Sequence, residues 1–100
     1  MEQLGEPDLG EAMRDLYRQW KDECRYNANR FMQLLDRAGP LKTAIQLVGS
    51  SQPSKGFLTL HAYKKLDLTV EALILRPEFS HLFPAQVVEM ARRRLDEFSN

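Results

Sequence analysis

The 100-residue chain contains only one cysteine and two histidines. Because a disulfide needs two thiols, Cys24 cannot form one within the chain, and a lone cysteine suits a reducing cytosol. His61 and His81 are far apart in sequence, and neither has a second ligand residue at helical spacing. Since the chain also lacks an HExxH motif, paired cysteines and an aspartate cluster, we expect no metal site and no other cofactor.

Long apolar runs are absent as well. No stretch of about 18 apolar residues occurs, so we expect no transmembrane helix. The N-terminal stretch MEQLGEPDLGEAM is acidic and has no apolar segment of the kind that secretory signals carry. The sequence therefore predicts a cytoplasmic protein that has no membrane partner.

The chain has no excess charge of either sign, with 14 basic and 14 acidic residues. This balance argues against strong non-specific binding to nucleic acid, which usually needs a positive excess. It conceals an asymmetry, because residues 1–23 contain seven acidic and three basic groups while residues 24–100 contain seven acidic and eleven basic groups. The first segment therefore has a net charge of −4 and the remainder +4.

Apolar residues make up 43% of the chain, enough to build the core of one domain. We expect a flexible N-terminus over residues 1–7 and a single helical domain over residues 8–98. The recurrence of apolar residues at spacings of three and four predicts an all-α fold. The connections are short, which favours a compact orthogonal bundle of five to six short helices.

Helix boundaries follow from glycine, proline and the apolar spacing. Gly39 is expected to close the second helix, Pro40 to open the third, Gly49 to end it, and Pro84 to open the last. The predicted helices begin near residue 8, surround residues 31–35, and cover 40–49, 56–66, 68–75 and 84–98, with an irregular turn at 77–83.

The segment LTVEALIL, residues 68–75, is the most apolar part of the chain. Its branched residues leave a β-strand as an alternative, but Glu71, Ala72 and Leu73 favour a helix. Asp67 precedes it and could accept a hydrogen bond from a free amide of the first turn, as an N-cap does. We therefore predict a helix capped by Asp67, with Leu73 and Ile74 in the core.

The predicted first helix carries one apolar stripe with acidic residues on the opposite face. Such a stripe is most often part of a core, but it becomes a partner-binding face if the helix is loosely attached. The residues of this candidate partner-binding site are Leu9, Met13, Leu16, Tyr17 and Trp20.

A second candidate surface is basic and would contact nucleic acid. The three successive arginines near the C-terminus cannot all face one phosphate track, because on a helix they point in different directions. At least one of them is expected to pair with Glu89, Asp96 or Glu97. The residues of this alternative site are Lys64, Lys65, Arg76, Arg92, Arg93 and Arg94.

Catalysis is the weakest interpretation. Lys21 and Arg25 lie near Cys24 in sequence and could lower the pKa of its thiol. A cysteine nucleophile also needs a base and an oxyanion site, and the spacing of His61 and His81 assigns neither. We therefore expect Cys24 to be a partly buried small apolar side chain, His61 to lie on a helix surface and His81 to lie in a connection.

Several residues form a pattern over residues 25–98, about three quarters of the chain. They are Phe31, Gly39, Ala44, Leu47, the turn Ser54-Lys55-Gly56-Phe57, Leu60, residues 66–75, Pro77-Glu78-Phe79, Leu82-Phe83, Ala91 and Arg94-Leu95. This pattern resembles a small helical region that recurs in uncharacterised bacterial proteins. The resemblance implies a bacterial or phage source and a helical fold, and it implies no activity, cofactor or catalytic residue.

The function predicted from the sequence is a non-catalytic interaction or adaptor module inside the cell, acting on another protein or on a second copy of itself. The alternative is an accessory protein that uses the basic residues to bind nucleic acid. A third interpretation is an enzyme or small-ligand binder built around Cys24 or His61.

Overall fold

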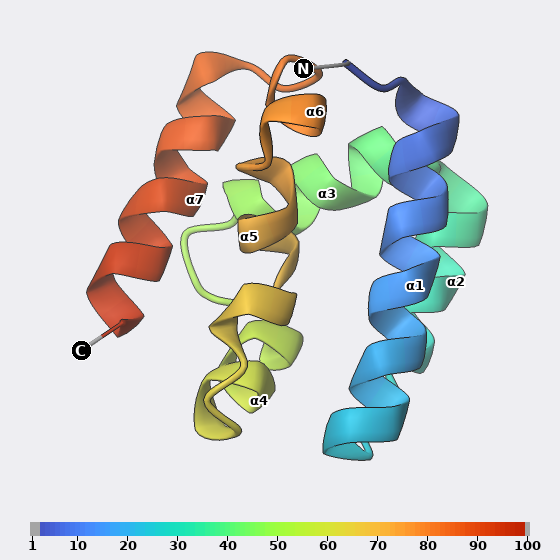
Figure 1. The fold of residues 1–100 in the computed structure, drawn as a ribbon, viewed down its shortest axis with the longest axis vertical. Helices are drawn as coiled ribbons and strands as arrows, with labels where there is room; N and C mark the ends of the chain where they lie inside the picture. The colour runs from blue at the N-terminus through green and yellow to red at the C-terminus, as the bar shows by residue number, and fades with distance from the viewer. Residues whose placement is uncertain (1–2, 100) are drawn as a thin grey trace.

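The computed structural model describes residues 3–99, and these residues form helices and no β-strand (Figure 1). The predicted all-α fold is therefore confirmed. Five of the helices within this range have eight or more residues, and two are shorter. The elements are α1 (Glu6–Cys24), α2 (Asn29–Ala38), α3 (Pro40–Gly49), α4 (Lys55–Ala62), the 3-10 turn η1 (Leu66–Leu68), α5 (Val70–Ile74), α6 (Pro77–Ser80) and α7 (Ala85–Phe98).

The helices pack into a body that measures 30 × 29 × 26 Å, with a radius of gyration of 12.4 Å. This radius is close to the value of about 13 Å that is usual for 100 residues. Helix α3 contacts α1, α2, α5 and α7, and in Figure 1 it crosses the space between α1 and α7. The core therefore lies around α3 and the short central helix α5.

Helix α1 begins at Glu6, two residues before the predicted start at Asp8. The Asp8 carboxylate accepts a hydrogen bond from the Gly5 amide at 3.0 Å, and Pro7 lies in the first turn, where its missing N–H costs nothing. The Leu4 amide donates to the Glu78 carbonyl at 2.9 Å. Part of the segment predicted to be flexible is thus bonded to α6, while residues 1–2 lie outside the described residues.

Gly39 joins α2 to α3 and has φ 87° and ψ 165°, a conformation that residues with a side chain rarely adopt. Its amide bonds the Leu35 carbonyl at 3.0 Å and ends α2. Pro40 then opens α3. Gly39, the N-cap residue, has no side chain to cap this helix, and the Glu6 carboxylate accepts a hydrogen bond from the Leu41 amide at 3.3 Å instead. The predicted roles of Gly39, Pro40 and the α3 end at Gly49 are confirmed.

The two helices after the polar loop are shorter than predicted. The Ser54 hydroxyl accepts the Phe57 amide at 3.1 Å, so α4 begins at Lys55, and it ends at Ala62, just before Tyr63 and the left-handed Lys64 (φ 60°). The predicted helix over 56–66 therefore ends four residues early. The polypeptide turns at Tyr63 and Lys64, and η1 and α5 follow.

Asp67 does not cap α5, so this prediction is wrong. Asp67 lies inside η1, and the cap is Thr69, whose hydroxyl accepts the Ala72 amide at 3.1 Å and donates to the Leu66 carbonyl at 2.7 Å. The predicted helix over 68–75 contracts to Val70–Ile74, because the 3-10 turn occupies the preceding residues. Leu73 and Ile74 are buried, as predicted.

The C-terminal part follows the expected order. A single turn, α6, provides the connection in which Phe79 and Phe83 are buried. Pro84 precedes the first residue of α7, which ends at Phe98 as predicted. Arg94 is buried on the inner face of α7, at a position that the apolar pattern did not single out.

Candidate functional site

A cavity of about 580 Å³ lies between the first turns of α2 and α4. The linker after α1 forms one end of it, and the start of α5 forms its floor. We call this cavity the α2–α4 groove. Its lining residues are Trp20, Tyr26, Asn27, Ala28, Asn29, Arg30, Phe31, Leu34, Leu47, Ser54, Lys55, Gly56, Phe57, Leu60, Thr69, Val70 and Glu71.

The aromatic side chains of the groove are held by other parts of the protein. Trp20 packs edge-on against Phe31, with ring centroids 4.8 Å apart, and is tilted against Tyr26 at 5.9 Å. Its indole N–H donates to the Leu68 carbonyl at 2.8 Å, which ties α1 to η1. Phe57 meets Phe98 edge-on at 5.1 Å. These contacts hold the rings against other parts of the protein and give the groove a largely apolar lining.

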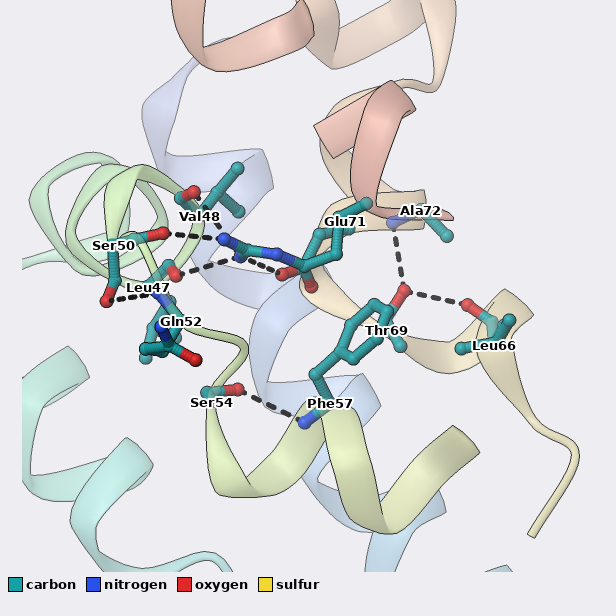
Figure 2. A network of polar contacts seen from close by, with 11 residues as sticks. Leu47, Val48, Ser50, Gln52, Ser54, Phe57, Leu66, Thr69, Glu71 and Ala72 are labelled. Carbon is teal, nitrogen blue, oxygen red and sulfur yellow. Dashed lines mark hydrogen bonds and ion pairs between the residues drawn. The ribbon is translucent and has the colours of Figure 1, made fainter. Parts of the chain in front are cut away.

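The polar groups of the floor are also engaged internally. The Thr69 hydroxyl makes the two hydrogen bonds of the α5 cap, shown on one side of Figure 2. The Glu71 carboxylate accepts a hydrogen bond from Arg94 at 2.9 Å, and both side chains are buried. Burial raises the pKa of Glu71, while the Arg94 hydrogen bond and charge oppose this shift.

Arg94 also closes the C-terminal end of α3. Its guanidinium donates to the carbonyl oxygens of Leu47, Val48 and Ser50, which lie together opposite Glu71 in Figure 2. The last carbonyls of a helix have no partner within the helix, so a cation placed there satisfies them and the negative end of the helix dipole. The buried Arg94–Glu71 pair thus joins α3, α5 and α7 and needs no ligand to explain it.

Four polar side chains are exposed at the mouth of the groove: Asn27, Asn29, Arg30 and Lys55. Asn27 accepts a hydrogen bond from the Tyr17 hydroxyl at 3.0 Å. Within residues 3–99, neither Arg30 nor Lys55 has an acidic partner in an ion pair. Burial raises the pKa of the Tyr26 hydroxyl, which lines the groove beside these side chains.

The apolar stripe of α1 lies inside the protein. Leu9, Met13, Leu16 and Trp20 are buried in the main core, and Tyr17 is partly exposed beside it. The stripe therefore packs across the remainder of the chain and does not form an exposed face. Only Trp20 also reaches the α2–α4 groove.

The six basic residues proposed for nucleic acid do not form one free surface. Arg94 is buried, and four others pair with neighbouring acids: Lys65 with Glu23, Arg76 with Glu78, and Arg92 and Arg93 with Glu89. The predicted pairing of the arginine run with Glu89 is confirmed. Lys64 is exposed and has no ion pair among the described residues.

Cys24 and the histidines do not assemble a reactive site. Cys24 is buried and its thiol pKa is raised, chiefly by burial and further by Glu23, with Lys65 opposing the shift. The lowered pKa considered from Lys21 and Arg25 is therefore wrong. His61 is exposed and packs edge-on against Phe98 at 5.2 Å, and the His81 ring bonds the Leu4 carbonyl at 2.8 Å. Among residues 3–99, no group of three potential metal ligands comes together.

Comparison with known proteins found no matching family model, no matching curated protein and no matching solved structure. Within the part of the chain that the structure describes, no helix combines the length and the apolar character that crossing a membrane requires. The α2–α4 groove itself was not predicted. Its residues come from five separate segments, and the only local signals were the turn Ser54-Lys55-Gly56-Phe57 and the weak helical pattern at Asn27 and Asn29.

Proposed function

We propose that the protein is a non-catalytic interaction module that holds a segment of a partner protein in the α2–α4 groove. The observation that supports this proposal is the groove itself, an apolar cavity whose mouth carries a few polar side chains. Ligand sites in proteins commonly have this composition and a volume of about 300–1,000 Å³. A groove between two helices is also a common way to receive a peptide.

A catalytic role has less support. A nucleophile needs a neighbouring base and a group that stabilises developing negative charge. Cys24 is buried with a raised pKa, and the polar groups of the groove floor are occupied by the α5 cap and by Arg94. We therefore propose a non-catalytic binding function for the protein.

Nucleic-acid binding is also less well supported than protein binding. Five of the six basic residues considered for it are in ion pairs with acids of the same chain. Such pairs reduce the number of charges available to neutralise phosphates. The resemblance to a region of bacterial proteins is the ground for proposing a bacterial or phage source, and the single cysteine is the ground for proposing a cytoplasmic location.

Site-specific photo-crosslinking in the host cell tests this function. A photoreactive phenylalanine analogue replaces Leu34, which lines the groove, or Leu58, which is exposed on α4 outside the groove. We expect a discrete adduct at position 34 and none at the control position 58. Protease should destroy this adduct, and nuclease should leave it intact. An adduct removed by nuclease would support the nucleic-acid alternative, and equal labelling at both positions would exclude the groove as the interface.

A further inference from the structure

We propose that the partner segment held in the α2–α4 groove is acidic and carries a bulky apolar side chain. Its carboxylates pair with Arg30 and Lys55 at the mouth, and its apolar side chain occupies the floor. This inference rests on the proposed function, because it specifies the chemistry of the segment that the same groove receives.

The floor selects an apolar group. Thr69 and Glu71 are polar side chains at the base of the groove, and both are hydrogen-bonded to other groups of the protein. A polar group buried there would lose its bonds to water and gain none, which is unfavourable. Leu34, Leu47 and Val70 line the cavity around them, so an aliphatic or aromatic side chain gains free energy on entering.

The same floor disfavours a nucleotide base. A base is usually held by stacking on an open aromatic face and by hydrogen bonds to its edges. The rings of Trp20, Phe31 and Phe57 are buried and pack edge-on against other rings of the chain. These three rings therefore present no open face for stacking, and the polar groups at the base, Thr69 and Glu71, are already hydrogen-bonded within the protein.

The mouth selects negative charge. Arg30 and Lys55 stand at the starts of opposite walls, and both are exposed without an ion-pair partner among the described residues. Among the described residues, Glu71 is the one acidic residue in the lining, and it pairs with Arg94 in the interior. The accessible charge of the groove is therefore that of the two cations, which attracts and orients an acidic segment.

The two helices reinforce this charge. The first residues of α2 and of α4 both line the groove, so the positive ends of two helix dipoles lie at its mouth. Ala28, at the start of α2, provides no side-chain cap for the first amides. The Asn29 side-chain amide is exposed beside them and can bond the backbone of an extended segment.

Selection of peptides from a random phage-displayed library on the immobilised full chain tests the proposal without assuming a sequence. We expect enriched peptides to combine several Asp or Glu residues with a Leu, Phe or Trp. Synthetic versions should lose at least about tenfold in affinity for the double variant Arg30→Glu/Lys55→Glu. Their affinity should also fall with rising salt, because the charges at the mouth are exposed.

The matched controls separate the charge from the groove. Arg37→Glu/Lys42→Glu makes the same change of net charge at exposed positions outside the lining and should leave affinity unchanged. Leu34→Arg places a charge inside the groove and should abolish binding, while Leu58→Arg should not. Circular dichroism and the emission of Trp20, the sole tryptophan, check that each variant is folded.

Each outcome decides a separate question. If Leu34→Arg abolishes peptide binding while Arg30→Glu/Lys55→Glu leaves the affinity unchanged, the proposal of an acidic segment is wrong and the proposal of an interaction module stands. Peptides insensitive to Leu34→Arg, or no enrichment at all, would overturn both. If laurate displaces the peptides at a lower concentration than the peptides themselves require for binding, the occupant is an acyl chain and not a partner segment. If the wild-type chain is a dimer that the Arg30→Glu/Lys55→Glu variant dissociates, the occupant is a second copy of the chain.

Discussion

Arg94 of α7 and Glu71 of α5 form an ion pair in the interior, with 2.9 Å between Nη1 and Oε2 and side-chain exposures of 8% and 3%. Arg94 makes further contacts, because its guanidinium also donates to three carbonyl oxygens at the end of α3. Removing one partner of a buried pair leaves the other charge without compensation.

The first prediction follows for Arg94→Met. We expect the free energy of unfolding to fall by about 3–5 kcal/mol, because Glu71 and the α3 carbonyls lose their partner. Urea denaturation followed by circular dichroism measures this change. Arg92→Met, at an exposed pair with Glu89, should cost less than about 1 kcal/mol. Equal effects of the two substitutions would show that the interior pair is not a stabilising junction.

Glu71 provides a second prediction, which concerns pH. Burial raises its folded pKa above the ordinary value of 4.5. Between that value and the raised one, the folded state binds more protons than the unfolded state, so the contribution of Glu71 to stability is complete below 4.5 and declines as pH rises. Glu71→Gln lacks this titration and can still accept a hydrogen bond from Arg94.

The variant should therefore gain stability relative to the wild type as pH rises above the ordinary carboxyl value of 4.5. Urea midpoints measured at several pH values for both proteins give this difference directly. The result is independent of the other titrating groups to the extent that they respond equally in both proteins. A difference that stays constant or reverses with pH would mean that Arg94 dominates over burial at this carboxylate.

The cap of α5 gives a third prediction, with a matched pair of positions. Thr69→Ala removes the hydroxyl that bonds Ala72 and Leu66, and we expect a loss of about 0.5–2 kcal/mol. Asp67→Ala alters an exposed residue of η1 and should change stability by less than about 0.5 kcal/mol. Thermal melts of both variants rank them, and a greater loss at Asp67 would restore it as the cap.

The Thr69 and Asp67 pair also shows where sequence reasoning stopped. Helix ends marked by Gly39, Pro40, Gly49 and Pro84 could be predicted, because proline fixes its own φ and glycine disfavours continued helix, and both effects are local to the residue. Between Leu66 and Thr69, two capping residues compete. A 3-10 turn occupies these residues, and Trp20 of α1 donates to its Leu68 carbonyl, a contact between distant parts of the chain that local sequence does not reveal.

The candidate site was harder to predict from the sequence than the fold, because it too depends on contacts between residues far apart in the chain. Arg94 looked like one of three surface arginines, and only the packing of α7 on α5 and α3 places it inside. Arg30 and Lys55 are separated by 24 intervening residues and meet at one groove only in the folded chain. Apolar periodicity identifies what is buried, but it does not pair surface residues from different helices.

A fourth prediction compares two glycines. Gly39 has φ 87° and ψ 165°, so Gly39→Ala should cost about 1–3 kcal/mol through backbone strain. Gly49 is the last residue of α3, has no positive φ, and has open space where a Cβ would stand. Gly49→Ala should therefore stabilise the protein by up to about 1 kcal/mol. Opposite shifts of the melting temperature are expected, and shifts of the same sign would contradict the assignment of strain to Gly39.

The last prediction tests the central position of α5 with two leucines. Leu73 is 3% exposed within the core cluster, whereas Leu58 is 46% exposed on α4. Leu73→Ala should lower the free energy of unfolding by about 2–5 kcal/mol, because it removes buried methyl groups and leaves a cavity. Leu58→Ala makes the same chemical change in solvent and should cost less than about 0.5 kcal/mol. Urea denaturation of both variants gives the comparison. Similar losses at the two positions would show that α5 is peripheral and that the core is organised around the longer helices alone.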